Sequence, residues 1–198
     1  MSETYRTVSG RASAAFEVRG SEFIGHIAPA ETVDAAESFV AEVEDEYADA
    51  THNVPAYRVR ADPFREYASD DGEPSGSAGK PALNVLQGEG IENVACVVTR
   101  YYGGTNLGYG GLVRAYSRAV SEAIEAAGTV EERPHTRLSI TAGYDDSGTV
   151  RGIIESSGCE FEAAYDERVS FAVRVPSEER EAFCDRLRDA TSGRVGIE

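Results

Sequence analysis

The sequence predicts an α+β protein of two domains. Its 198 residues exceed the commonest single-domain size of about 100 to 150 residues. A short charged segment with a proline, residues 129–136 (TVEERPHT), separates two regions of regular hydrophobic pattern. Helix-like and strand-like periods occur on both sides of this segment. We therefore expect one domain over residues 1–130 and a second over residues 131–198.

The first region predicts strands mixed with two amphipathic helices. Residues 16–27 favour two strands that break at Arg19-Gly20-Ser21, and Thr32 is placed to cap the first helix. A second helix is expected to begin near Gly110 and to end at Gly128. The remaining elements expected here are a strand at 52–60, a short helical turn at 83–86 and a strand at 94–102.

The second region has the order β-α-β-β-α-β. The expected strands cover residues 137–142, 159–164, 169–175 and 194–197, and the expected helices cover 147–156 and 177–190. Ser177 precedes three charged residues and is expected to cap the last helix. This order is that of a ferredoxin-like domain, which needs only about 60 residues.

The composition indicates a water-soluble chain without a metal or disulfide framework. No apolar run approaches the roughly 18 residues of a membrane span, and the start lacks the pattern of a signal peptide, so we expect a cytoplasmic protein. Cys96, Cys159 and Cys184 lie far apart and without CxxC spacing, which indicates buried hydrophobic side chains. His26 and His52, like His135, stand alone, and we assign them no catalytic role. No cofactor and no metal is expected.

The charge is strongly acidic, with a net value of -16 and Lys80 as the single lysine. Such a balance normally argues against nucleic acid binding, but an acidic, lysine-poor chain is also typical of proteins adapted to high salt. We infer a halophilic source. Residues 50–118, in contrast, carry as many basic as acidic side chains. This balance indicates either a partner surface or extensive burial.

The first segment that could carry chemistry is the glycine-rich run Ser69–Pro81. Its glycines and free amides could form an anion-binding nest beside Ser75, Ser77 and Lys80. It is not a Walker loop, because Pro74 and Pro81 occupy positions that need other residues.

The same run holds an SxxK spacing and three acidic residues. Ser77 and Lys80 have the spacing of penicillin-recognising acyl enzymes, but Gly79 and Pro81 disfavour the helix that this chemistry needs. The acidic residues could hold a hard cation, although turns and solvated loop charges are the favoured interpretation; they are Asp70, Asp71 and Glu73.

The second segment covers residues 99–116, where a strand enters a glycine-rich turn that opens a helix. Arg114 and Arg118 share one face of that helix, which indicates an external anion or, as the competing account, an Arg118–Glu122 pair. Tyrosines with a nearby arginine and asparagine form a mixture that can stack single-stranded bases and contact phosphates. The members are Arg100, Tyr101, Tyr102, Asn106 and Tyr109.

Three runs together resemble the IMPACT/YigZ family. They are residues 49–57 (DATHNVPAY), 69–81 and 93–116, and the resemblance extends over roughly residues 14–128, while the C-terminal region resembles the smaller domain of the bacterial branch. The resemblance implies a first domain of the ribosomal-protein and elongation-factor domain IV type, followed by a ferredoxin-like domain. It implies translation regulation, as in the eukaryotic relatives, and it carries no catalytic residues. This sequence departs from the family in its acidity.

The sequence therefore predicts a non-enzymatic, translation-associated binding protein whose partner is RNA, the ribosome or a translation factor. A purely protein-binding regulator is the alternative, and a nucleotide-dependent phosphoryl transferase is a third hypothesis. The predicted partner surface combines the two segments, with Ser75, Ser77, Lys80, Arg100, Tyr101, Tyr102, Asn106, Tyr109, Arg114 and Arg118.

Overall fold

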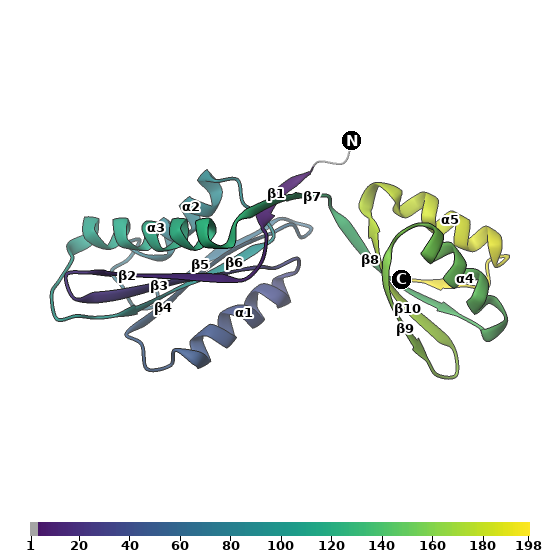
Figure 1. Cartoon of the computed structure of the whole chain (residues 1–198), viewed down its shortest axis with the longest axis horizontal. Coiled ribbons are helices and arrows are strands. Elements are labelled where there is room, and N and C mark those ends of the chain that lie inside the picture. The colour runs from purple at the N-terminus through teal and green to yellow at the C-terminus, as the bar shows by residue number, and fades with distance from the viewer. Residues whose placement is uncertain (1–3) are drawn as a thin grey trace. The chain divides into compact units, whose positions relative to one another are not determined.

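A computed structural model describes residues 4–198 and resolves the chain into two compact units (Figure 1). The first unit comprises Tyr5–Glu132, and the second contains Arg133–Glu198. Each unit has its own hydrophobic core, and none of the sheets formed by residues 4–198 contains strands of both. None of the described helices is long and apolar enough to cross a membrane.

The first unit is built on an antiparallel five-stranded sheet. Its order is β2 (Ala12–Val18), β3 (Ser21–Pro29), β6 (Val94–Tyr101), β4 (His52–Val59) and β5 (Arg65–Ala68). Helix α1 (Val33–Glu46) packs on one face, whereas α2 (Gly79–Gly88) and α3 (Gly108–Ala127) pack on the other (Figure 1). The unit is therefore a three-layer α+β structure, as the mixed pattern predicted.

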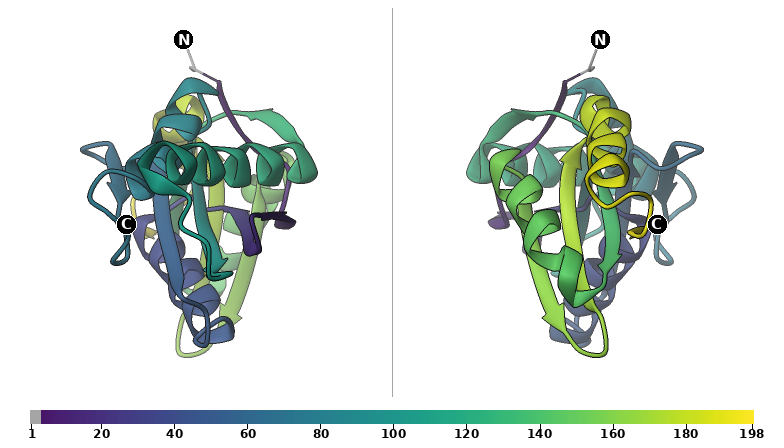
Figure 2. Two further views of the ribbon diagram at one scale, coloured as in Figure 1. Left: turned by 90° about the vertical axis from the view of Figure 1, so that its left-hand side faces the viewer. Right: turned by 90° about the vertical axis from the view of Figure 1, so that its right-hand side faces the viewer.

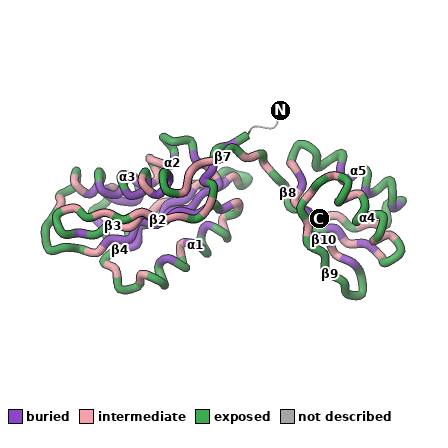
Figure 3. Tube along the Cα trace, in the orientation of Figure 1, coloured by how far each residue is buried: buried purple, intermediate pink, exposed green. Residues whose placement is uncertain are grey.

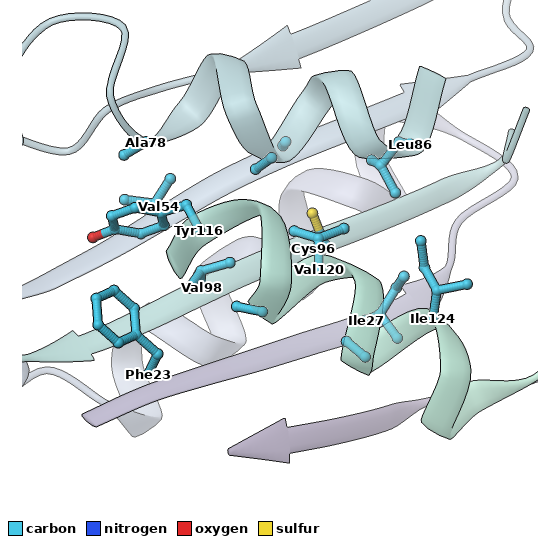
Figure 4. Packing of buried hydrophobic residues seen from close by; sticks show 14 of the residues in the cluster. Phe23, Ile27, Val54, Ala78, Leu86, Cys96, Val98, Tyr116, Val120 and Ile124 are labelled. Carbon is cyan, nitrogen blue, oxygen red and sulfur yellow. The ribbon is translucent and has the colours of Figure 1, made fainter. Parts of the chain in front are cut away.

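Two hydrophobic clusters fill the spaces on either side of this sheet. The larger cluster lies under α2 and α3, where Phe23 packs edge-on against Tyr116 at 5.4 Å between ring centroids (Figure 4). The smaller cluster lies under α1 around Phe39 and Val43. Because both faces are covered, β6 is buried up to its last residue, while the edge strand β2 is at most half-buried (Figure 3).

Most predicted element ends lie within a few residues of the observed ones. Strands β2 and β3 are joined by Arg19 and Gly20, both with positive φ, as a tight two-residue hairpin requires. The Thr32 hydroxyl accepts a hydrogen bond from the Ala35 amide at 3.1 Å, so the predicted cap is present. Gly128 follows the last residue of α3 as expected.

The prediction of only a helical turn at 83–86 was wrong. Helix α2 already begins at Gly79, and Pro81 lies in its first turn. Proline is tolerated there because the first amides of a helix have no partner inside the helix. Gly79 and Pro81 therefore do not prevent a helix at this place.

A two-stranded antiparallel sheet accompanies the first unit. Strand β1 (Tyr5–Val8) pairs with β7 (Thr129–Glu132), which is the first half of the segment that was expected to be a boundary. Neither β1 nor β5 nor β7 was predicted, because runs of four residues carry too little periodic pattern.

The second unit has the predicted β-α-β-β-α-β connectivity. Its elements are β8 (His135–Ala142), α4 (Tyr144–Ser156), β9 (Glu160–Tyr165), β10 (Val169–Pro176), α5 (Arg180–Ala190) and β11 (Gly196–Ile197). The sheet is antiparallel with the order β11-β8-β10-β9, and α4 and α5 pack together on one face (Figure 2).

Ser177 does not cap the last helix as predicted. A 3₁₀ turn, Ser177–Glu179, precedes α5, and neither helical segment has a side-chain cap. The Ser177 hydroxyl is instead 3.1 Å from the Thr136 hydroxyl of β8. The Ser177 hydroxyl therefore contacts the neighbouring strand β8, not the helix end that the local sequence indicated.

Candidate binding cleft

The two glycine-rich segments meet at one end of the first unit and form a cleft of about 480 Å³. The cleft is lined by the start of β4, the loop before α2, the end of β6 and the loop that opens α3. The lining residues are Thr51, His52, Glu73, Pro74, Arg100, Tyr102, Asn106, Leu107, Gly108, Tyr109 and Leu112. Four of the ten predicted surface residues, Arg100, Tyr102, Asn106 and Tyr109, are among them.

The loop before α2 does form a nest of amides, but the protein supplies its own anion. The Asp70 carboxylate accepts hydrogen bonds from the amides of Gly76 and Gly79, both at 2.8 Å, and of Ala78 at 3.2 Å. Burial alone would raise the pKa of Asp70, but these three bonds together hold the pKa below its ordinary value. The predicted external anion at this nest is therefore replaced by Asp70, which also caps α2 from eight to nine residues upstream.

A charged network lies beneath the cleft. One carboxylate oxygen of Glu73, Oε1, accepts a hydrogen bond from the Arg100 guanidinium at 2.5 Å and another from the Tyr116 hydroxyl at 2.7 Å. The Glu73 and Arg100 side chains are only 4% and 6% exposed. Burial, reinforced by the bond to Glu73, raises the pKa of Tyr116, so its hydroxyl stays a proton donor. The tyrosine ring meanwhile belongs to the apolar cluster beneath (Figure 4).

This network corrects two expectations. Arg100 was predicted to meet an external anion, but its charge is neutralised internally by Glu73, and its guanidinium lies over the Phe23 and Tyr102 rings. Glu73 was interpreted as a solvated loop charge, yet it is buried. A buried arginine needs a partner inside the protein, because leaving it unpaired would be costly.

His52 adds a second polar group to the cleft. Its Nδ1 atom lies 2.6 Å from the Asp71 carbonyl oxygen, and its Nε2 atom lies 3.8 Å from Glu73 Oε2. The Asp71 carboxylate accepts a hydrogen bond from the backbone amide of Asn53 at 2.7 Å, which fixes the loop to the start of β4. Loop and strand together set the direction of the imidazole ring.

The mouth of the cleft carries aromatic side chains. Tyr102 and Tyr109 are 46% and 59% exposed. The Tyr102 hydroxyl donates to Asn106 Oδ1 at 3.2 Å, and the Tyr109 hydroxyl donates to the Gly76 carbonyl at 3.1 Å. These hydrogen bonds hold both rings in place, and a large part of each side chain remains exposed to solvent.

Close backbone packing positions the loop that follows β6. A Cβ atom on Gly103 would lie 1.9 Å from the carbonyl carbon and oxygen of Gly20 in the β2–β3 hairpin. The Gly103 amide also donates to the Ser21 hydroxyl at 3.1 Å. Only glycine allows this approach, which aligns the hairpin with the loop that carries Tyr102.

Arg114 and Arg118 have different surroundings. The Arg118 guanidinium donates to Glu122 at 2.6 Å and lies 4.0 Å from the centre of the Phe16 ring, so the competing structural account of this residue is correct. Arg114 is exposed and forms no ion pair with any described residue. A Cβ atom on Gly110 would lie 3.4 Å from its guanidinium, which therefore lies near the first turn of α3.

The remaining predicted residues lie outside the cleft lining. Ser75 and Lys80 are exposed, whereas Ser77 is fully buried, and its hydroxyl has no hydrogen-bond partner in the described part of the chain. Tyr101 donates to Asp49 at 2.7 Å, and this bond raises the pKa of Tyr101 to about 12. Within residues 4–198, no group of three or more metal-ligating side chains is arranged to hold an ion.

Sequence reasoning missed His52 and Glu73. His52 pairs with Arg100 in the register between β4 and β6, and Glu73 approaches from a loop that looks polar in sequence. The available signal was Arg100 at the end of an otherwise apolar strand, since a buried arginine implies a nearby carboxylate.

Fold and site define a two-unit α+β protein with a preformed polar cleft in its first unit. Comparison with known proteins shows which family this chain belongs to. Residues 19–124 match the Impact N-terminal domain, and residues 140–194 match a domain of unknown function (DUF1949). The chain belongs to the IMPACT family.

Relatives of similar length exist in bacteria. The chain is 35% identical over 198 residues to the IMPACT family member YvyE of Bacillus subtilis, covering 100% of this chain and 91% of the relative. It is 35% identical over 184 residues to the IMPACT family member YigZ of Escherichia coli, covering 91% and 90%. A crystal structure of a hypothetical protein superimposes with a TM-score of 0.74 at 32% identity, covering 100% of this chain and 97% of the other.

Proposed function

We propose that this protein is a cytoplasmic, non-enzymatic binding protein of the translation apparatus that contacts RNA, as part of the ribosome, through the mouth of the cleft. The observation that carries the proposal is the pair of exposed, anchored tyrosines, Tyr102 and Tyr109. Arg114, whose guanidinium lies near Gly110 and forms no ion pair with any described residue, follows Tyr109 on the same helix. Tyrosine rings in this setting stack on unpaired bases, with about 1 to 3 kcal/mol per base.

The start of α3 supports a phosphate contact beside these rings. Leu107 provides no side-chain cap, so the first amides of a 20-residue helix keep their hydrogen-bonding capacity. A cation near a helix N-terminus is unfavourable in isolation. Arg114 in this position is therefore best explained by an anion that binds the guanidinium and the amides together.

The acidic surface restricts the mode of binding. With a net charge of -16, the chain cannot rely on a diffuse basic face, and in molar salt the screening length falls to about 3 Å. Short contacts survive under these conditions: one arginine fork, helix amides and ring stacking. This mode of contact agrees with the inferred high-salt source.

The domain types implied by the family resemblance complete the proposal. We assign the first unit to the fold type shared with ribosomal proteins and elongation-factor domain IV, and the second to the ferredoxin-like type. The support for the second assignment is its sheet order, β11-β8-β10-β9, with both helices on one face.

Co-sedimentation of the purified chain with ribosomal particles tests the proposal. Binding is expected at about 0.2 M KCl and is expected to persist at about 2 M KCl, because the contacts are short-ranged. Binding to ribosomal particles, without binding to isolated ribosomal proteins, supports the RNA contact. Binding to a protein factor alone would favour the protein-only alternative, and magnesium-dependent ATP binding would favour phosphoryl transfer.

A further inference from the structure

The floor of the cleft contains a carboxylate oxygen that lacks a donor. Glu73 Oε1 already accepts two hydrogen bonds, from Arg100 and Tyr116. Oε2 accepts none from any residue that the structure describes, and it is not among the fully buried polar atoms, so it faces the open cleft. A ligand that fills the cleft would shield this oxygen from water, so it has to offer an N–H or O–H bond in exchange.

The neighbouring imidazole presents a second acceptor. A carbonyl oxygen only accepts hydrogen bonds, so the 2.6 Å contact to the Asp71 carbonyl places a proton on His52 Nδ1. In the neutral ring Nε2 then carries a lone pair, 3.8 Å from Glu73 Oε2. Two acceptors that face the same space are both satisfied by one group that has two N–H bonds, namely an amino group.

The walls of the cleft suit a flat ring. Tyr102 and Tyr109 stand at its mouth, and Pro74, Leu107 and Leu112 provide apolar surface. The volume of about 480 Å³ lies in the range of small-molecule sites and is sufficient for one nucleobase with its sugar. The space therefore combines stacking surfaces at the entrance with hydrogen-bond acceptors at the floor.

We propose that the cleft accepts one unpaired nucleobase that carries an exocyclic amino group, and that this group donates to Glu73 Oε2 and His52 Nε2. Cytosine, adenine and guanine carry such a group, whereas uracil would direct a carbonyl oxygen at two acceptors. The proposal rests on RNA being the partner, as proposed above. Stacking alone does not distinguish one base from another, so these hydrogen bonds would add selectivity for the base.

The charge of the site favours a neutral amino group over a free cation. Arg100 already balances the Glu73 carboxylate, so the network beneath the cleft carries no net charge before a ligand enters. An ammonium group of a protein partner would bring an extra positive charge close to the buried guanidinium. A base amino group brings only the two donors that the floor lacks.

Oligonucleotide binding to the full chain tests this selectivity without any change to the protein. Fluorescence anisotropy with labelled single strands compares oligo(C) with oligo(U), and an adenine-containing strand with the same strand carrying purine, which lacks only the amino group. Because a mismatched polar group leaves buried acceptors unpaired, we expect about tenfold tighter binding of the amino-bearing member of each pair. His52→Ala should abolish most of that ratio, whereas His135→Ala, at an exposed site in the second unit, should keep it.

Equal affinity for both members of each pair, with binding clearly measurable, would overturn the base selectivity while leaving RNA contact intact. Failure to bind any strand, together with failure to co-sediment with ribosomal particles, would overturn the proposed function itself. Ribosome binding that persists without binding of any strand would show that the contact does not use an unpaired base, and the base-binding proposal would be wrong.

Discussion

Removing the Glu73 carboxylate should be the most damaging single change at the cleft. In Glu73→Ala, the Arg100 guanidinium, whose side chain is 6% exposed, keeps its charge but loses its counter-ion. The Tyr116 hydroxyl loses its acceptor in the same step. Breaking a buried pair by removing one partner costs about 3 to 5 kcal/mol, whereas Tyr116→Phe, which removes one hydrogen bond, should cost about 1 kcal/mol.

Urea unfolding followed by tyrosine fluorescence measures these costs in the full chain. All tyrosines except Tyr144 and Tyr165 lie in the first unit, so the signal reports mainly on the unit that contains Glu73. In a double-mutant cycle, Glu73→Ala with Arg100→Ala should cost less than the sum of the single changes by more than about 1 kcal/mol. A cost below about 1 kcal/mol for Glu73→Ala, or additivity in the cycle, would refute the buried network.

Two further changes test the loops that build the cleft. Asp70→Ala should destabilise the first unit by about 2 kcal/mol, because three amides lose their acceptor. The pKa of Asp70 is depressed in the folded state, so its contribution is present above the unfolded-state pKa and is lost as the pH falls through the folded-state pKa. An acid titration of stability should therefore be flatter in Asp70→Ala than in the wild type, and identical curves would exclude this role. Gly103→Ala should cost about 1 to 3 kcal/mol because its Cβ would meet the Gly20 backbone, whereas Gly88→Ala, with no atom within 4 Å of the added Cβ, should be close to neutral. Equal thermal stability of these two glycine variants would contradict the close approach.

Local pattern was sufficient wherever neighbouring residues decide the structure. The cap of α1 by Thr32, the Arg118–Glu122 pair and the β-α-β-β-α-β order all depend on residues close together in sequence. The start of α2 does not, because its amides are satisfied by Asp70 from an earlier turn of the loop. Capping patterns in a sequence span only about three residues, so they do not reveal a helix start whose amides bind a more distant side chain.

The two segments that line the cleft were expected to lie together, but the charged network beneath the cleft was not predicted. The sequence placed the two glycine-rich segments on one surface, and the cleft joins them. It did not show that Arg100 faces inward to Glu73, nor that Tyr101 is held by Asp49, 52 residues away. Both outcomes depend on the register of β6 with β4 and on the path of a loop, which residue patterns do not encode.

The measurement that tests the central claim most directly is ribosome co-sedimentation of the Tyr102→Ala/Tyr109→Ala variant in about 2 M KCl. The matched control is Tyr67→Ala/Tyr165→Ala: these two residues are 46% and 59% exposed, as Tyr102 and Tyr109 are, but they lie outside the cleft. We predict that the cleft variant loses binding by at least about tenfold, from one stacked base or more at about 1 to 3 kcal/mol each, while it unfolds at the same urea concentration as the control. Equal co-sedimentation of the two variants, both folded, would contradict the assignment of the cleft mouth as the RNA-binding surface.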